Sequence, residues 1–140
     1  MRTGVILLLV LVGACSADTQ PALVASDVTI TQPMPGMTMS AGYLTLTNNS
    51  DETITITRVT SPHYASVELH ESVVDDGVAR MRRLEKIEIP TGTKTILAPG
   101  GKHLMLMRPA GVAADSVSLQ FYDGATLLLT VTSSRPQDSR

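Results

Sequence analysis

The stretch AGYLTLTNNSDETITITRVT, residues 41–60, decides the fold. Leucine or isoleucine alternates with threonine in both of its halves, and successive side chains of a β-strand point to opposite faces of a sheet. Between the halves, NNSDE at residues 48–52 supplies Asn, Ser and Asp, which favour chain reversal. The stretch therefore predicts two strands, residues 41–48 and 52–60, each with one face in a core.

The same alternation continues over the rest of the chain. Asp, Pro and Gly punctuate it in DDG, PTG, APGG and YDG, and no window has the period of a three-turn amphipathic helix. Further strands are predicted at residues 24–31, 65–71, 78–84, 86–89, 93–97, 103–107, 116–122 and 126–132. We therefore expect a single all-β domain, built as a Greek-key sandwich or barrel.

Composition excludes several classes of function. A chain of 140 residues suits one domain with its own core. Charged residues make up 17% of it and the formal net charge is −2, so no basic surface for nucleic acid is expected. One Phe, three Tyr and no Trp argue against a base-stacking platform. The sequence also lacks a phosphate-binding loop, G-x-S-x-G and H-E-x-x-H, so we expect no enzyme.

The N-terminus resembles an export signal. Arg2 precedes the apolar run GVILLLVLV, which is too short to span a bilayer. LVGAC, residues 11–15, resembles the bacterial lipobox, in which the cysteine becomes the lipid-modified first residue of the mature protein. Cys15 is the sole cysteine; the alternative is an incidental residue near the cleavage point of a simple signal peptide.

These features divide the chain. We expect a signal peptide at residues 1–14, a tether at 15–22, the folded domain at 23–134 and a mobile tail at 135–140. Lipid chains on Cys15 would hold the domain in the periplasm, at the surface of a bacterial membrane.

Unusual side chains lie on the strands opposite the aliphatic face. In HLMLMR, residues 103–108, the two leucines form one face, which leaves an imidazole and two thioethers on the other. In SVELHE, residues 66–71, Glu68 and a histidine share the face opposite Val67 and Leu69. Both histidines are therefore expected to point outward. The candidate metal ligands are His70, Met81, His103 and Met105, with Met107 in reserve.

The four candidate ligands have the spacing H-x10-M-x21-H-x-M. This pattern closely resembles the signature of the periplasmic PCu(A)C family of copper chaperones, and the flanking VELHE, MRRLEKIEIP and PGGKHLMLM resemble the family's surroundings of it. The resemblance covers about residues 41–131. It implies a cupredoxin-like fold, with these four side chains binding Cu(I).

The chemistry of the donors supports a soft metal. Thioether sulfur is uncharged and soft, so Mg²⁺ and Ca²⁺ avoid it and Zn²⁺ rarely uses it when His or carboxylate is available. Two Met with two His therefore indicate Cu(I). A blue-copper electron carrier needs a Cys thiolate beside its histidines, and the one cysteine here lies at the expected lipid position. We expect the ion to be held and handed on by ligand exchange.

The family resemblance also implies a recipient. Copper would reach the copper centre of cytochrome c oxidase, either directly in subunit II or through a thioredoxin-like assembly protein. The domain is expected to be a monomer. Two alternatives stay open: a copper buffer or resistance protein that uses the same site, and a structural or adhesive lipoprotein domain whose methionines bind no metal.

Other donors are less constrained by the sequence. PMPGMTM places three methionines, Met34, Met37 and Met39, in a Pro/Gly loop. They form either an auxiliary Cu(I) site beside the main one or a cap over the open edge of the sandwich. His63 is a candidate fifth donor, although a connecting loop is its more natural place. The basic run RMRR, residues 80–83, either forms a solvated face or docks an acidic patch on a partner.

Overall fold

The computed structural model describes residues 20–33, 36–110 and 115–134, which form eleven strands and no helix. Among these residues, accordingly, no helix is long and apolar enough to cross a membrane. The strands are β1 (Leu23–Ile30), β2 (Met39–Asn48), β3 (Ile54–Ile56), β4 (Arg58–Thr60), β5 (Tyr64–Asp75), β6 (Val78–Leu84), β7 (Ile87–Ile89), β8 (Lys94–Leu97), β9 (Lys102–Pro109), β10 (Ser116–Asp123) and β11 (Thr126–Ser134).

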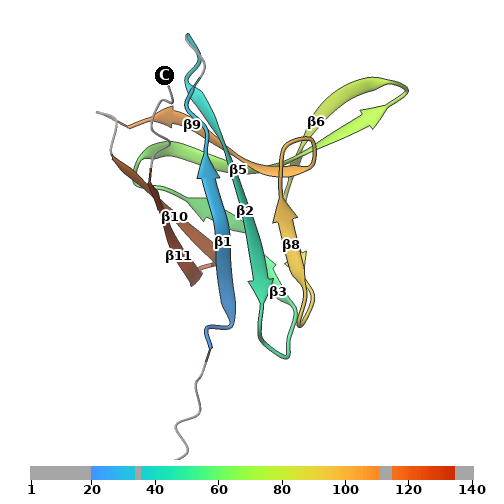
Figure 1. Cartoon of the computed structure of the whole chain (residues 1–140), viewed down its shortest axis with the longest axis vertical. Helices are drawn as coiled ribbons and strands as arrows, with labels where there is room; N and C mark the ends of the chain where they lie inside the picture. Colours follow the sequence, from blue (N-terminus) through green and yellow to red (C-terminus); the bar gives the residue numbers. More distant parts are fainter. Residues whose placement is uncertain (1–19, 34–35, 111–114, 135–140) are drawn as a thin grey trace, which may run out of the picture.

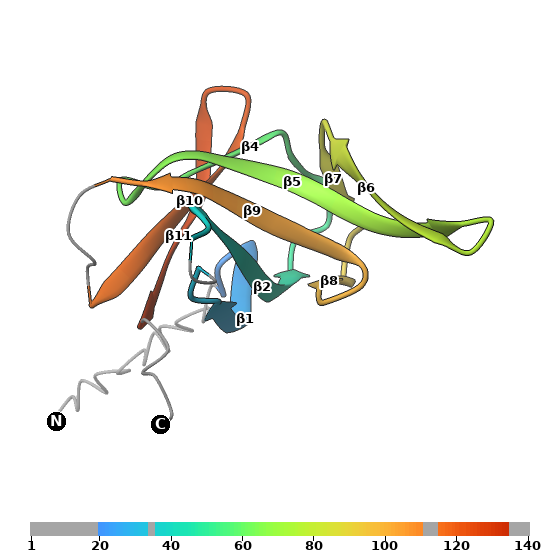
Figure 2. The ribbon, with the colours of Figure 1, turned by 90° about the horizontal axis from the view of Figure 1, so that it is seen from above.

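One antiparallel sheet makes up most of the domain. Its strands follow the order β1-β2-β9-β5-β4-β10-β11, while β6 adds to β5, β8 adds to β2, and β3 pairs with β7 in a small second sheet. The two outermost strands of the large sheet, β1 and β11, approach each other. The Ser133 hydroxyl on β11 donates a hydrogen bond of 3.3 Å to the Val28 carbonyl on β1. Figure 2 shows the sheet curling round in this way. The all-β Greek-key sandwich or barrel predicted from the sequence is confirmed.

The core lies on the aliphatic faces that the alternation predicts. Leu44 and Leu46 of β2 are 2% and 0% exposed, and Leu104 and Leu106 of β9 are both fully buried. Burying one such side chain contributes about 2 kcal/mol. Phe121, the single phenylalanine, is also fully buried, on β10. The same leucines that fill the core therefore fix which side chains β9 presents on its other face.

The prediction of one continuous strand at residues 52–60 is wrong. Residues 52–60 form two short strands, β3 and β4, because the chain changes sheets at Thr57. There the Thr57 amide donates to the Tyr122 carbonyl at 2.9 Å, and its hydroxyl accepts from the Gly124 amide at 2.8 Å. The buried positions move from even to odd numbers between Ile56 and Val59, and this shift of parity is the sequence signal for the break.

A long hairpin carries one of the candidate ligands. β5 runs to Asp75, four residues beyond the predicted end, and a two-residue turn of Asp76 and Gly77 joins it to β6. Both turn residues have positive φ, 48° and 76°, as a type I′ turn requires. The DDG sequence is therefore confirmed as a turn. The tip of this hairpin projects away from the other strands (Figures 1 and 2).

Candidate metal centre

The register of β5 and β9 brings the two histidines together. His70 lies directly opposite His103, and Met105 lies opposite Glu68. Directly opposed residues of antiparallel strands point to the same face, and the neighbouring Leu104 faces the core. The two imidazoles and the Met105 thioether therefore share the face away from the core, as the sequence predicts.

Met81 lies on the same face, across β5 from His103. Met81, on β6, is directly opposite Ser72 of β5, which makes it a diagonal neighbour of His70. Its side chain is 52% exposed. Met81 and Met105 thus flank the histidine pair on opposite sides along the strands. Long thioether side chains are suited to reaching inward from both positions.

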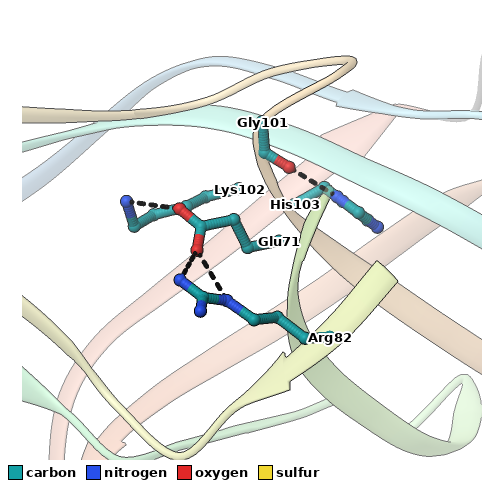
Figure 3. Close-up of polar contacts among 5 residues, drawn as sticks. All are labelled: Glu71, Arg82, Gly101, Lys102 and His103. Atoms are coloured by element: carbon teal, nitrogen blue, oxygen red, sulfur yellow. Dashed lines mark hydrogen bonds and ion pairs between the residues drawn. The ribbon is translucent and has the colours of Figure 1, made fainter. Parts of the chain in front are cut away.

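His103 lies on the predicted face, away from the core, and is nonetheless buried, at 5% exposure. Alternation along a strand gives the face of a side chain but not whether other chain segments cover that face. The ring Nδ1 lies 2.9 Å from the Gly101 carbonyl oxygen (Figure 3). Because a carbonyl can only accept, Nδ1 carries the proton, and Nε2 holds the lone pair that a metal needs.

His70 offers a lone pair on its other ring nitrogen. Its Nε2 lies 2.9 Å from Glu68 Oε2, and because an ionised carboxylate only accepts, the proton is on Nε2. Nδ1 is buried and has no hydrogen-bond partner among the described residues. An unpartnered polar atom in a buried position is costly unless something else satisfies it. The His70 and His103 ring centroids are 6.0 Å apart, a separation that suits a metal ion bound between them.

Glu68 supplies negative charge beside the two rings. The hydrogen bond from His70, together with the Arg83 guanidinium 3.4 Å away, holds the pKa of this carboxyl below its usual range despite the opposing effect of burial. The carboxylate therefore stays ionised. The sequence places Glu68 on this face but does not reveal its contact with His70, although side chains two residues apart on a strand are neighbours on one face.

A second carboxylate fixes the strands from the core side of the sheet. Glu71 accepts two hydrogen bonds from Arg82 of β6, the shorter at 2.6 Å, and one of 3.1 Å from Lys102 of β9 (Figure 3). The Arg82 and Lys102 contacts hold the pKa of Glu71 below its usual range. Three strands are thereby joined one residue away from the histidine pair.

The basic run RMRR, residues 80–83, therefore forms ion pairs within the protein. Arg82 pairs with Glu71, and Arg83 pairs with Glu68. Two of its three arginines already have acidic partners on β5, which weakens the idea that the run docks an acidic patch.

Comparisons with known proteins place this fold. The sequence profile of the LpqE-like family, described as "Putative lipoprotein LpqE-like", matches residues 23–132. The chain belongs to the LpqE-like family. Among its relatives, "Putative lipoprotein Lxx21020" of Leifsonia xyli subsp. xyli is 35% identical over 99 residues, or 65% of this chain and 58% of that protein. An uncharacterized protein of Rickettsia prowazekii, RP573, is 28% identical over 71 residues, 50% of this chain and 39% of that protein. This LpqE-like chain thus spans less than two thirds of either relative.

Solved structures show the same fold. Cu(I)-bound DR1885 from Deinococcus radiodurans superposes with a TM-score of 0.67 and 24% identity, covering 89% of this chain and 85% of that one. The copper-bound PCuAC domain of PmoF2 gives 0.65 and 18%, covering 81% and 92%. The LpqE-like chain therefore has the fold of PCuAC domains, and the resemblance drawn from its sequence is confirmed.

The remaining predicted donors of the LpqE-like chain lie in different places. Met39 of β2 is directly opposite Met107 of β9, and Met107 is the next residue after Met105 on the same face of that strand. His63 lies in the turn before β5, seven residues before His70 and so roughly 20 Å away along the extended chain. There its Nδ1 accepts a hydrogen bond of 3.2 Å from the Ser118 amide. The structure therefore does not bring His63 to the site. Cys15, Met34, the signal peptide and the tail lie outside the described residues.

Proposed function

We propose that this protein is an exported Cu(I)-binding metallochaperone with His70, Met81, His103 and Met105 as its ligands. The observation that carries the proposal is the pair of imidazoles at 6.0 Å, one of which has a buried Nδ1 without a partner among the described residues. Hydrogen bonds to Glu68 and to the Gly101 carbonyl leave one lone pair on each ring. Such outer contacts orient metal-binding histidines in general.

Copper(I) fits this donor set better than other biological ions. Imidazole suits several transition metals, but thioethers select soft ions, and both ligand types are neutral. The ionised Glu68 next to His70 offsets the single positive charge of Cu(I) without binding it directly. The copper-bound solved structures of the same fold support the assignment. None of the four donors needs to be oxidised, reduced or deprotonated for the ion to bind or leave.

Delivery is the use of copper that we favour. Met81 is more than half exposed, so an acceptor protein has access to one ligand before the others separate. By family resemblance, the proposed acceptor is the copper centre of cytochrome c oxidase, reached through subunit II or a thioredoxin-like assembly protein. The lipoprotein descriptions of its family and relative support export, with a lipid on Cys15 as the membrane anchor. We propose a monomer without enzymatic activity.

A competition titration tests the binding site. The full chain is titrated against a chromogenic Cu(I) chelator without oxygen, alongside a His70→Ala, Met105→Leu variant and a His63→Gln control. Loss of high-affinity binding in the double variant, with wild-type binding in the control, is expected. Wild-type affinity in the double variant would end the assignment.

A deletion strain separates delivery from buffering. Loss of oxidase activity when copper is scarce supports delivery. Sensitivity only to excess copper supports the buffering alternative, and absence of any Cu(I) binding supports a structural lipoprotein domain.

A further inference from the structure

Two M-x-M sequences meet where β2 pairs with β9. Met39 is the first residue of β2 and Met37 lies two residues before it, while Met105 and Met107 lie on β9. Met39 is directly opposite Met107, and the Cβ atoms of such pairs lie about 5 Å apart. The Arg108 amide donates to the Thr38 carbonyl at 2.8 Å, which extends the backbone pairing to the residue before β2. The backbone that carries Met39 and Met107 is therefore paired and does not form a free loop.

These methionines do not fill the core. Met37 is 45% exposed and Met39 is 38% exposed. With Met105 they line a hollow of about 360 Å³, whose lining also includes Ala41. A cap over the open edge of the sandwich would bury its methionines. Their exposure favours the auxiliary-site interpretation of this segment over the capping interpretation.

The hollow has the chemistry of a soft-metal site. Its lining among the described residues consists of thioethers and neutral groups such as Thr31 and Tyr43, without a charged side chain. Thioethers need no deprotonation and select soft ions, above all Cu(I) and the chemically similar Ag(I). A neighbouring hollow of about 330 Å³ shares Met39, adds Met107, and includes Glu68, which brings a negative charge to its wall. Arg108 also lines that second hollow. Met39 lines both hollows, so Met37 of the first hollow and Met107 of the second are both its neighbours.

We propose that Met37, Met39 and Met107 form a second Cu(I) site, built from thioethers alone and adjoining the His70–His103 site. Met105 lies between the two, since it shares a face with His103 and lines the hollow with Met37 and Met39. An ion passes from one site to the other by exchanging thioether ligands at Met105. Copper stays monovalent throughout, and no proton or electron moves. The existence of this site does not depend on His70 or His103, whereas its role as a loading position rests on the proposed chaperone function.

The intact chain allows the site to be observed directly. Methionine methyl groups are labelled with ¹³C, and their NMR signals are followed as the full chain is titrated with Ag(I), a redox-inert probe of Cu(I) sites. The first equivalent is expected to shift the Met81 and Met105 signals, and the second to shift Met37, Met39 and Met107. Saturation without any shift of the last three signals would overturn the proposal.

Variants separate this site from the one proposed above. In a His70→Ala, His103→Ala background, one equivalent of Ag(I) is still expected to bind, and it should be lost when Met37, Met39 and Met107 are replaced by Leu. Leucine keeps the apolar volume and removes only the sulfur. Met81→Leu in the same background is the matched control and should retain binding. Retained Ag(I) binding in the triple Leu variant, or lost Ag(I) binding in the Met81→Leu control, would refute the second site. Neither result would bear on the His70–His103 site.

Discussion

Replacing Glu68 by Gln tests how the candidate centre fixes the donor atom of His70. The carboxylate accepts from Nε2 at 2.9 Å, and the two side chains are 24% and 17% exposed. Hydrogen bonds to a charged group contribute about 1 kcal/mol more than neutral ones, which corresponds to roughly fivefold in affinity. An amide also donates as readily as it accepts, so Gln no longer keeps the proton off Nδ1.

The charge of Glu68 adds to this effect. Gln removes the negative charge that offsets the bound cation, and the loss of an outer hydrogen-bond partner weakens metal sites by about 10- to 100-fold. We therefore expect Glu68→Gln to lower Cu(I) affinity about tenfold, measured by anaerobic competition with a chromogenic chelator.

Glu71→Gln is the matched control for this change. It alters a carboxylate on the same strand that is also ion-paired, but whose contacts are to Arg82 and Lys102. Its Cu(I) affinity should equal that of the wild type. Wild-type affinity in Glu68→Gln, or an equal loss in both variants, would refute the view that Glu68 acts through the His70 ring.

Two further predictions concern stability. At Gly42, an added Cβ would lie 3.1 Å from Leu106 Cδ1 and 3.2 Å from Leu104 Cβ, so Gly42→Ala should destabilise the fold by about 1 kcal/mol in urea unfolding. In the control Gly101→Ala, the new Cβ meets only the Ala98 carbonyl oxygen, at 3.7 Å, and stability should not fall. Equal unfolding midpoints for the two variants would contradict the packing argument. The pKa of Glu71 is lowered by folding, so its contribution to stability is present above the unfolded value of about 4.3 and is lost as pH falls through the folded value. The gap in unfolding midpoint between wild type and Glu71→Gln should therefore shrink between pH 7 and roughly pH 3; a gap that widens on acidification would reverse the sign.

Local features of the structure were predictable from the sequence. The alternation of residues 41–48 and the Asp76-Gly77 turn depend on neighbouring residues alone, and both predictions are confirmed. The division at Thr57 lies within a stretch whose Ile and Thr residues alternate like a single strand, and only the change in parity of the buried positions marks it. Sequence also places Glu68 and His70 on one face, since they are two residues apart.

Features that depend on register were beyond sequence reasoning. His103 is only 5% exposed although it lies on the face away from the core, and alternation does not describe how far a face is covered. The contacts of Glu71 need three strands aligned at once. The pairing of Met39 with Met107 likewise depends on where β2 meets β9. The spacing H-x10-M-x21-H-x-M nevertheless selects residues that lie on one face, while their role as ligands stays a prediction.

The hairpin of β5 and β6 divides the proposed site into a rigid half and a hinged half. β9 lies between β2 and β5, whereas β6 pairs with β5 alone in the described sheet. Elements with few neighbours open locally at a lower free energy than those in the middle of a sheet. Met81 can therefore withdraw with the hairpin while His103 and Met105 keep their positions. The lifetime of the bound ion would then be set by the bending of one hairpin, and its affinity by the strand at the centre of the sheet.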